Sequence, residues 1–141
     1  MKQQKLILQD LEDMYRFASM VAESARVFDG PCMIHLSGDL GAGKTTFCQY
    51  FIETFGYQGH VSSPSYALVN TYATQECNIA HADFYRLDEE DSLDLIGWDM
   101  VCEESDILLI EWPVATMSEP DMLIQFAFSE SIRSVTWIQY S

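Results

Sequence analysis

The chain has 141 residues, and its seven basic and 22 acidic side chains give a formal net charge of −15 at pH 7. Its hydrophobic fraction of 48% is ordinary for a folded protein, so we expect a single domain over residues 1–141. Because nucleic-acid binding needs a basic face to displace counterions from phosphates, the composition argues against direct binding of RNA or DNA.

Residues 5–10 (KLILQD) predict a short strand, and Asp10 is placed to cap a following helix, with Asp13 completing a variant of the capping box. Apolar side chains then recur at helical spacing and predict a buried stripe: Leu11, Met14, Phe17 or Ala18, Val21 and Ala25. Gly30-Pro31 ends this helix. Residues 32–38 (CMIHLSG) predict a buried strand that leads into a glycine-rich loop, and residues 44–55 predict the next helix, closed by Gly56.

The second half of the chain is rich in strand patterns. After a turn-rich stretch at 58–65, residues 66–73 and 77–85 predict a hairpin, and residues 88–97 predict a short acidic helix that ends at Gly97. Residues 106–112 (DILLIEW) predict a buried strand, and residues 122–128 and 133–140 an antiparallel pair. The expected fold class is α/β, with a P-loop NTPase-type central mixed sheet flanked by helices and an antiparallel portion.

The loop between the strand at 32–38 and the helix at 44–55 carries the strongest motif. It fits G-x-x-x-x-G-K-[ST] at every fixed position with Gly38, Asp39, Leu40, Gly41, Ala42, Gly43, Lys44 and Thr45. In such a loop successive backbone N–H groups point at phosphate oxygens, and the helix N-terminus adds its positive dipole end. Lys44 would reach the β- and γ-phosphates, the Thr45 hydroxyl would bind Mg²⁺, and Thr46 would add a phosphate contact.

Two acidic residues near strand ends are candidates to complete a metal site. Glu111 follows four apolar strand residues, so it would bind Mg²⁺, directly or through water, or polarise the attacking water; the alternative is a solvent-facing carboxylate. Asp83 shares a strand face with His81, where a magnesium-bound nucleotide would compensate its charge; the alternative is a structural pair with Arg86 or His81. His81 is interpreted as a hydrogen-bonding support, not as a catalytic base.

Four stretches in this order resemble the TsaE (YjeE) family of ATPases, which act in making threonylcarbamoyladenosine in tRNA. They are GDLGAGKTTF, SSPSYALVNTY, HADFYRL and LLIEWP, and the similarity covers roughly residues 5–128. The resemblance implies ATP and Mg²⁺ as cofactors, phosphate and magnesium binding by Lys44 and Thr45, and a metal and water site completed by Asp83 and Glu111. It also implies that residues 62–66, with Ser65, form a switch-like loop that responds to the γ-phosphate. Trp112 would shape the nucleotide pocket, unless it is a core aromatic.

The sequence departs from the family pattern in that second stretch. Ser65 stands where threonine is usual and keeps a hydroxyl, whereas Ala67 replaces a second threonine and lacks one. A polar contact at position 67 is therefore not expected.

The resemblance implies a partner-dependent ATPase that acts on a TsaB–TsaD protein complex. The acidic composition agrees, whether it serves solubility alone or docking to a basic partner. Because almost no arginine is expected near the loop, an arginine finger is lacking and we expect slow intrinsic hydrolysis. The alternatives are a small-molecule kinase, which the scarcity of basic residues after Lys44 disfavours, and an ATP-gated binding module with incidental hydrolysis.

The expected compartment is the cytoplasm, with no membrane contact. No apolar run approaches the roughly 18 residues of a membrane span, and the first residues lack a signal-peptide pattern. The four cysteines are far apart and form no C-x-x-C pair, so they are interpreted as reduced core residues.

Overall fold

A seven-stranded mixed sheet forms the centre of the molecule, with its strands in the order β1-β7-β6-β2-β5-β4-β3. This computed structural model describes residues 1–64, 67–87, 92–115 and 117–140. The elements are β1 (Lys2–Leu8), α1 (Leu11–Arg26), β2 (Cys32–Ser37), α2 (Lys44–Thr54), β3 (Val69–Ala73), β4 (Asn78–Asp83), α3 (Ser92–Leu95), α4 (Trp98–Glu104), β5 (Ile107–Glu111), β6 (Met122–Ser129) and β7 (Ile132–Gln139).

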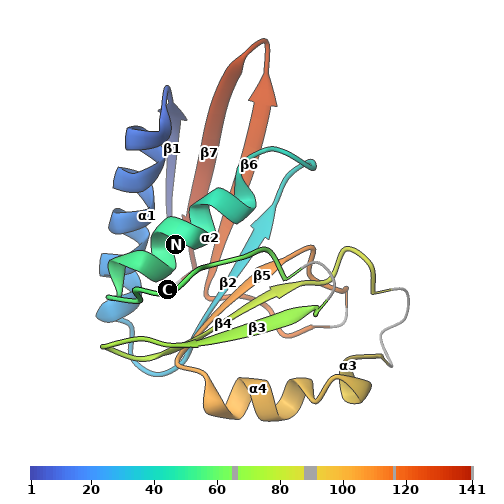
Figure 1. Cartoon of the computed structure of the whole chain (residues 1–141). Coiled ribbons are helices and arrows are strands. Elements are labelled where there is room, and N and C mark those ends of the chain that lie inside the picture. Colours follow the sequence, from blue (N-terminus) through green and yellow to red (C-terminus); the bar gives the residue numbers. More distant parts are fainter. Residues whose placement is uncertain (65–66, 88–91, 116, 141) are drawn as a thin grey trace.

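The middle of the sheet is parallel and both sides are antiparallel. Strands β4, β5, β2 and β6 run in one direction, while β3 pairs antiparallel with β4, and β7 pairs antiparallel with both β6 and β1. The predicted α/β class with an antiparallel portion is therefore confirmed. Because β2, β4 and β5 are parallel neighbours, their carboxyl ends meet at one edge of the sheet, next to the N-terminus of α2 (Figure 1).

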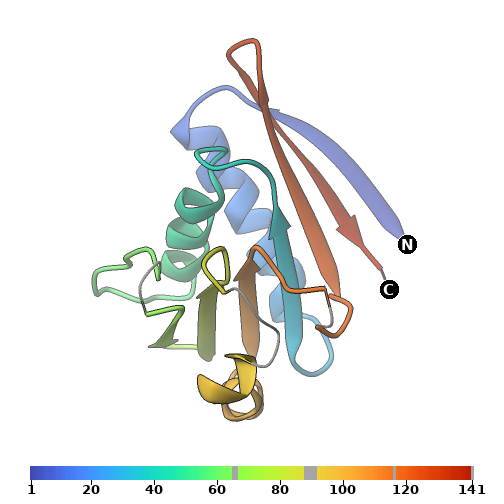
Figure 2. The same cartoon turned by 90° about the vertical axis from the view of Figure 1, so that its right-hand side faces the viewer.

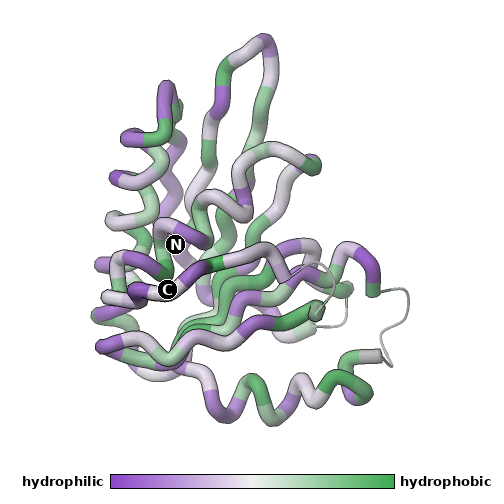
Figure 3. Tube along the Cα trace, in the orientation of Figure 1, coloured by the Kyte–Doolittle hydropathy of each residue, from purple (hydrophilic) through white to green (hydrophobic). Residues whose placement is uncertain are grey.

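Helices cover the sheet on both faces (Figure 2). Helices α1 and α2 pack on one face over a large core, while α4 covers the β3-β4-β5 side through a smaller cluster around Trp98 and Phe84, whose rings stack edge-to-face at 5.2 Å. Hydrophobic colouring is concentrated in the central strands (Figure 3). The buried face of α1 matches the predicted stripe except at Leu11, which is 59% exposed. Leu11 is the first residue of α1.

The predicted cap of α1 is present. Asp10 accepts a hydrogen bond from the Asp13 N–H at 2.8 Å, and the Asp13 carboxylate accepts one from the Gln9 N–H, also at 2.8 Å. These bonds satisfy donors that the first helical turn leaves unpaired. The cap fixes where α1 begins, directly after β1.

One helix was not predicted from the sequence. The described part of the predicted acidic helix at 88–97 is α3, and Gly97 closes it, since its N–H donates to the Asp94 carbonyl oxygen at 3.2 Å. With φ +72°, Gly97 is also the left-handed N-cap of α4, the helix that was missed. Residues 88–91 lie outside the described part. None of the described helices is long and apolar enough to cross a membrane.

Candidate functional site

The glycine-rich loop joins the end of β2 to the start of α2, as predicted. Gly38 has φ +136°, and a Cβ at this position would lie 2.5 Å from the backbone oxygen of Phe126 on the neighbouring strand β6. An L-residue avoids this backbone conformation, and the close approach leaves no room for a methyl group. Glycine here lets the chain turn tightly off the sheet, so that the loop curls over the helix N-terminus.

Lys44 is folded into the loop that carries it. The side chain is only 4% exposed, and its ammonium donates hydrogen bonds to the carbonyl oxygen of Gly38 and, at 3.3 Å, to that of Asp39. The same nitrogen lies 3.8 Å from the centroid of the Trp112 ring. Burial lowers the pKa of Lys44 from its ordinary value, while nearby Glu111, Asp83 and Asp39 oppose that shift. The ammonium is therefore bound by the carbonyl oxygens of Gly38 and Asp39, which the oxygens of a bound anion would replace.

Trp112 reaches Lys44 through an unusual backbone conformation. Its φ of +54° turns the chain sharply at the end of β5, and the ring packs against Tyr85 with centroids 5.0 Å apart. A non-glycine residue in this region is a strained feature that clusters at functional sites. The half-buried ring lies at the mouth of the loop and not in either hydrophobic core cluster.

Glu111 and Thr45 meet at the mouth of the loop. The Thr45 hydroxyl lies 3.2 Å from both carboxylate oxygens of Glu111, which is buried at the end of β5. The alternative of a solvent-facing Glu111 is therefore wrong. Two oxygen ligands of the kind that Mg²⁺ prefers are thus side by side next to Lys44.

His81 supports Glu111 from the neighbouring strand. Its Nε2 lies 2.6 Å from Glu111 Oε2, and both side chains are buried. The interpretation of His81 as a hydrogen-bonding support fits this contact. The alternative in which His81 pairs with Asp83 does not, because the contact goes to Glu111.

Asp83 lies directly beside Glu111 in the parallel register of β4 and β5. Its carboxylate accepts a hydrogen bond from the Tyr85 N–H at 3.0 Å. Asp83 is half-buried and does not line the cavity over the loop, whereas Glu111 does. Asp83 is therefore farther from this cavity than Glu111.

A cavity of about 170 Å³ lies over the loop and gathers most of the predicted site residues. Its lining consists of Leu40, Gly41, Gly43, Lys44, Thr45, Thr46, Glu111 and Trp112. Gly38 and Asp39 contribute their carbonyl groups, and Ala42 is buried beneath. Ser65 and Tyr66 lie outside the described residues, so the switch-like loop is described only through Pro64.

Sequence reasoning missed two residues at this site. Arg133, on β7, lies beside the loop, with its Nε 3.7 Å from the position that a Cβ of Gly43 would occupy. The expectation of almost no arginine near the loop is wrong in this respect, because pairing of β6 with β7 brings the arginine in from far along the chain. Cys48, read from the sequence as a core residue, is buried next to His81 and Glu111. Its position three residues after Thr45 on a helix was the available signal.

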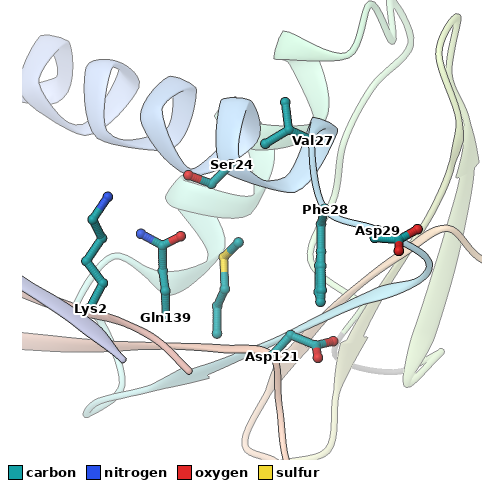
Figure 4. A pocket seen from close by; sticks show the side chains of 8 residues that line it. Lys2, Ser24, Val27, Phe28, Asp29, Asp121 and Gln139 are labelled. Atoms are coloured by element: carbon teal, nitrogen blue, oxygen red, sulfur yellow. The ribbon is translucent and has the colours of Figure 1, made fainter. Parts of the chain in front are cut away.

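A larger cavity lies elsewhere, between the end of α1 and the strands β1, β6 and β7 (Figure 4). It has a volume of about 560 Å³ and is lined in part by Lys2, Ser24, Asp29 and Asp121. Asp121 already accepts a hydrogen bond from the Met33 N–H at 2.8 Å. With two carboxylates, one ammonium and no glycine-rich turn, this cavity is unsuited to phosphate, so we assign the functional site to the smaller one.

The fold and the site define a mixed α/β protein in which a glycine-rich, lysine-bearing loop meets a strand-end carboxylate. The family model described as "Threonylcarbamoyl adenosine biosynthesis protein TsaE" matches residues 8–135. The chain belongs to this family, and its role lies in threonylcarbamoyladenosine biosynthesis on tRNA.

Individual relatives agree with that assignment. The chain is 36% identical to the TsaE protein of Haemophilus influenzae over 109 residues, covering 75% of this chain and 69% of the relative. It is 36% identical to the TsaE protein of Bacillus subtilis over 112 residues, covering 79% and 68%. The crystal structure of YdiB from Bacillus subtilis superposes with a TM-score of 0.73 at 24% identity, covering 99% of this chain and 87% of that one. At that identity the structural match supports the fold.

Proposed function

We propose that the chain is a cytoplasmic, Mg²⁺-dependent ATPase that hydrolyses ATP slowly by itself and faster on a TsaB–TsaD protein complex. One observation carries the proposal: the Thr45 hydroxyl lies 3.2 Å from both oxygens of the buried Glu111 carboxylate, directly beside Lys44 in the loop. A phosphate-binding loop alone would serve many functions. A carboxylate beside the threonine that would bind the metal adds a group that can hold Mg²⁺ or orient the attacking water, as phosphoryl transfer to water requires.

The residues present fit a magnesium ion. Mg²⁺ takes oxygen ligands and is held in nucleotide sites by one or two carboxylates or hydroxyls together with phosphates. Thr45 and Glu111 supply such oxygens, and Asp83 stands next to Glu111 in the register of β4 and β5. When bound, the ion would neutralise charge on the β- and γ-phosphate oxygens.

The chain's own groups would do the rest. The Lys44 ammonium would leave the carbonyl groups of Gly38 and Asp39 and bind phosphate oxygens. The negative charge of these oxygens would compensate the positive charge of the buried ammonium. Glu111 would hold the metal or orient the attacking water, with His81 fixing the carboxylate from behind. The Trp112 ring would narrow the mouth of the cavity and limit access of bulk water.

Slow intrinsic hydrolysis follows if no arginine reaches the γ-phosphate. Arg133 is the arginine to test, because it lies beside Gly43, but its guanidinium packs 5.1 Å from the Phe128 ring. Arginine fingers raise turnover by about 10³–10⁵-fold. We therefore expect the R133M variant to hydrolyse ATP within a few-fold of the unmodified chain. A loss of 100-fold would assign Arg133 to the transferred phosphate.

The proposal is tested by ATP hydrolysis of the purified chain, alone and with TsaB and TsaD, using K44A and E111A as controls. We expect low activity alone, a clear rise with the partners, and loss of both in each variant. Fast turnover alone, about 1–100 s⁻¹ as in kinases, that the partners leave unchanged would refute the partner-driven ATPase.

The Glu111→Ala variant also separates hydrolysis from docking. If it binds the partner complex in the presence of ATP and loses only turnover, hydrolysis is a separate step that follows docking. If the unmodified chain does not hydrolyse ATP even with its partners, the ATP-gated binding module is the better description.

A further inference from the structure

Three side chains of different metal-binding types meet behind the phosphate loop. The Sγ of Cys48, a ring nitrogen of His81 and a carboxylate oxygen of Glu111 all lie within 4.8 Å of one another. Cys48 and His81 have no exposed surface and Glu111 is 3% exposed. Clusters of exposed acidic groups are common on protein surfaces, but a buried thiol, imidazole and carboxylate in mutual reach is a different arrangement.

Three separate elements hold these side chains in place. Cys48 lies on α2, one turn beyond Thr45, and belongs to the core between this helix and the sheet. His81 and Glu111 lie on the neighbouring parallel strands β4 and β5 and are already in contact, Nε2 to Oε2, at 2.6 Å. The cluster is therefore a fixed part of the fold.

We propose that Cys48, His81 and Glu111 form a binding site for Zn²⁺, and that Zn²⁺ bound there removes Glu111 from the catalytic site. The first half of this proposal is independent of the enzymatic activity. The second half rests on the proposed function, since it requires Glu111 to act with Mg²⁺ in hydrolysis.

The ligand set suits zinc better than magnesium. Sulfur, imidazole nitrogen and carboxylate oxygen are the three protein ligand types of zinc, whereas Mg²⁺ is bound by oxygen. With metal–ligand distances of about 2.0–2.3 Å, tetrahedral geometry separates ligand atoms by roughly 3.3–3.7 Å. Distances of up to 4.8 Å in the cluster would shorten by about 1 Å and the 2.6 Å contact of His81 with Glu111 would lengthen by about 0.7 Å to reach that geometry, which small side-chain rotations supply.

Charge balance allows a cation at this depth. A thiolate, a carboxylate and a neutral imidazole around Zn²⁺ sum to zero, so no net charge is buried. Without a cation, burial together with the nearby carboxylates Glu111 and Asp83 raises the pKa of the Cys48 thiol well above its ordinary value. The Cys48 proton would leave to solvent as the sulfur–zinc bond forms.

The two ring nitrogens of His81 differ: Nε2 faces Glu111 and is the one that can share a metal ion with it, whereas Nδ1 does not. Its Nδ1 is buried and has no hydrogen-bond partner in the part of the chain that the structure describes. Buried polar atoms are nearly always paired, with protein, water or an ion. Nδ1 lies on the side of the ring away from the nitrogen that faces Glu111, so it can carry the ring proton when Nε2 binds Zn²⁺.

Access to the site leads through the phosphate loop. Glu111 and Thr45 both line the cavity above the loop, and the Thr45 hydroxyl lies 3.2 Å from both carboxylate oxygens. A cation that enters this cavity reaches Glu111 first. If it then settles toward Cys48 and His81, the carboxylate turns away from Thr45 and is lost to Mg²⁺.

Cobalt provides a direct test, because Co²⁺ occupies zinc sites and a thiolate ligand gives it a strong charge-transfer absorption. Titrating the nucleotide-free chain with Co²⁺ should produce this absorption, and added Zn²⁺ should remove it. The C48A variant should lose this absorption. C48S is the second variant, to be used if C48A folds poorly, and it should lose the absorption as well. The matched control is C77S, because Cys77 is half-buried just before β4, outside the cluster. Absence of the absorption in the unmodified chain, or equal absorption in C48A, would overturn the site.

Inhibition provides the second arm. At fixed MgATP, the Zn²⁺ concentration that halves the rate of hydrolysis should be the same for the unmodified chain and C77S. For C48A, measured against its own uninhibited rate, this Zn²⁺ concentration should be at least tenfold higher. Equal inhibition of all three would overturn the competition for Glu111. If the chain hydrolyses no ATP, the proposed function fails, yet the cobalt titration still decides whether the zinc site exists.

Discussion

The close approach of Gly38 to strand β6 makes a specific prediction for Gly38→Ala. The added Cβ would lie 2.5 Å from the Phe126 backbone oxygen and 3.0 Å from the Phe126 Cβ, at a φ of +136°. A backbone oxygen within a paired strand cannot swing aside as a long side chain does. Either the loop or β6 must therefore move.

Two costs add at this position. Holding a non-glycine residue in this region costs about 1–3 kcal/mol, and forcing an extra carbon into a packed site costs about 1–3 kcal/mol more. Replacing glycine also restricts the unfolded chain, which returns about 0.4–1 kcal/mol. The expected net loss in the free energy of unfolding is about 1–6 kcal/mol, a large part of the 5–15 kcal/mol typical of a domain.

Gly41 in the same loop is the matched control. It also has a positive φ, +78°, but a Cβ there would meet no atom within 4 Å. G41A therefore carries the backbone strain without the collision, and we expect a loss of only about 1–2 kcal/mol. Urea unfolding, followed by circular dichroism on both variants and the unmodified chain, measures the difference. If G38A is as stable as G41A, the approach of the loop to β6 is wrong.

Three further predictions concern the cap of α1, a buried histidine and the thiols. D10A should lose about 1 kcal/mol of unfolding free energy, because it removes the acceptor of the Asp13 N–H, whereas the exposed E12A should stay within about 0.5 kcal/mol; thermal unfolding checks both. Burial lowers the pKa of His35, so the folded protein keeps it neutral while the unfolded chain takes up a proton below about pH 6.5. Stability should therefore fall as the pH drops below that value, by at most about 1.4 kcal/mol per pH unit, and H35Q should show a shallower fall in urea unfolding. Burial raises the pKa of Cys32 to about 12, so alkylation at pH 8 followed by mass spectrometry should modify the half-buried Cys77 long before Cys32; equal rates would contradict the described burial.

Much of the fold was predictable because its patterns are local. The Asp10 cap, the apolar stripe of α1 and the strand–loop–helix around Lys44 each depend on neighbours in sequence. The glycine at 97 shows the limit of this reasoning. A left-handed glycine can end one helix and also begin the next, and Gly97 does both. The second helix, α4, is held against the sheet because its buried Trp98 packs on Phe84. Trp98, Val101 and Cys102 at helical spacing were the signal for α4.

The candidate site was predictable where a motif fixes the spacing and not where tertiary contacts do. Lys44, Thr45 and Glu111 could be placed together because the parallel order of β2 and β5 follows from a phosphate loop between strand and helix. The approach of Arg133 could not be predicted, since it depends on the β6-β7 register that brings a distant strand beside the loop. Cys48 gave no motif at all, and only the packing of α2 on β4 and β5 brings its sulfur to His81.

The pairing of β1 with β7 has a kinetic consequence. Leu8 pairs with Arg133, so this ladder closes a loop of about 125 residues, whereas the β3-β4 hairpin closes one of only four, residues 74–77. Closure entropy rises by about 0.6 kcal/mol for each doubling of loop length, or roughly 3 kcal/mol between these two pairings. The hairpins should therefore form early and β1 should add last, onto the edge of a sheet whose parallel centre is already built. In native-state hydrogen exchange β1 would be the first strand to open, leaving the phosphate loop and its carboxylate undisturbed.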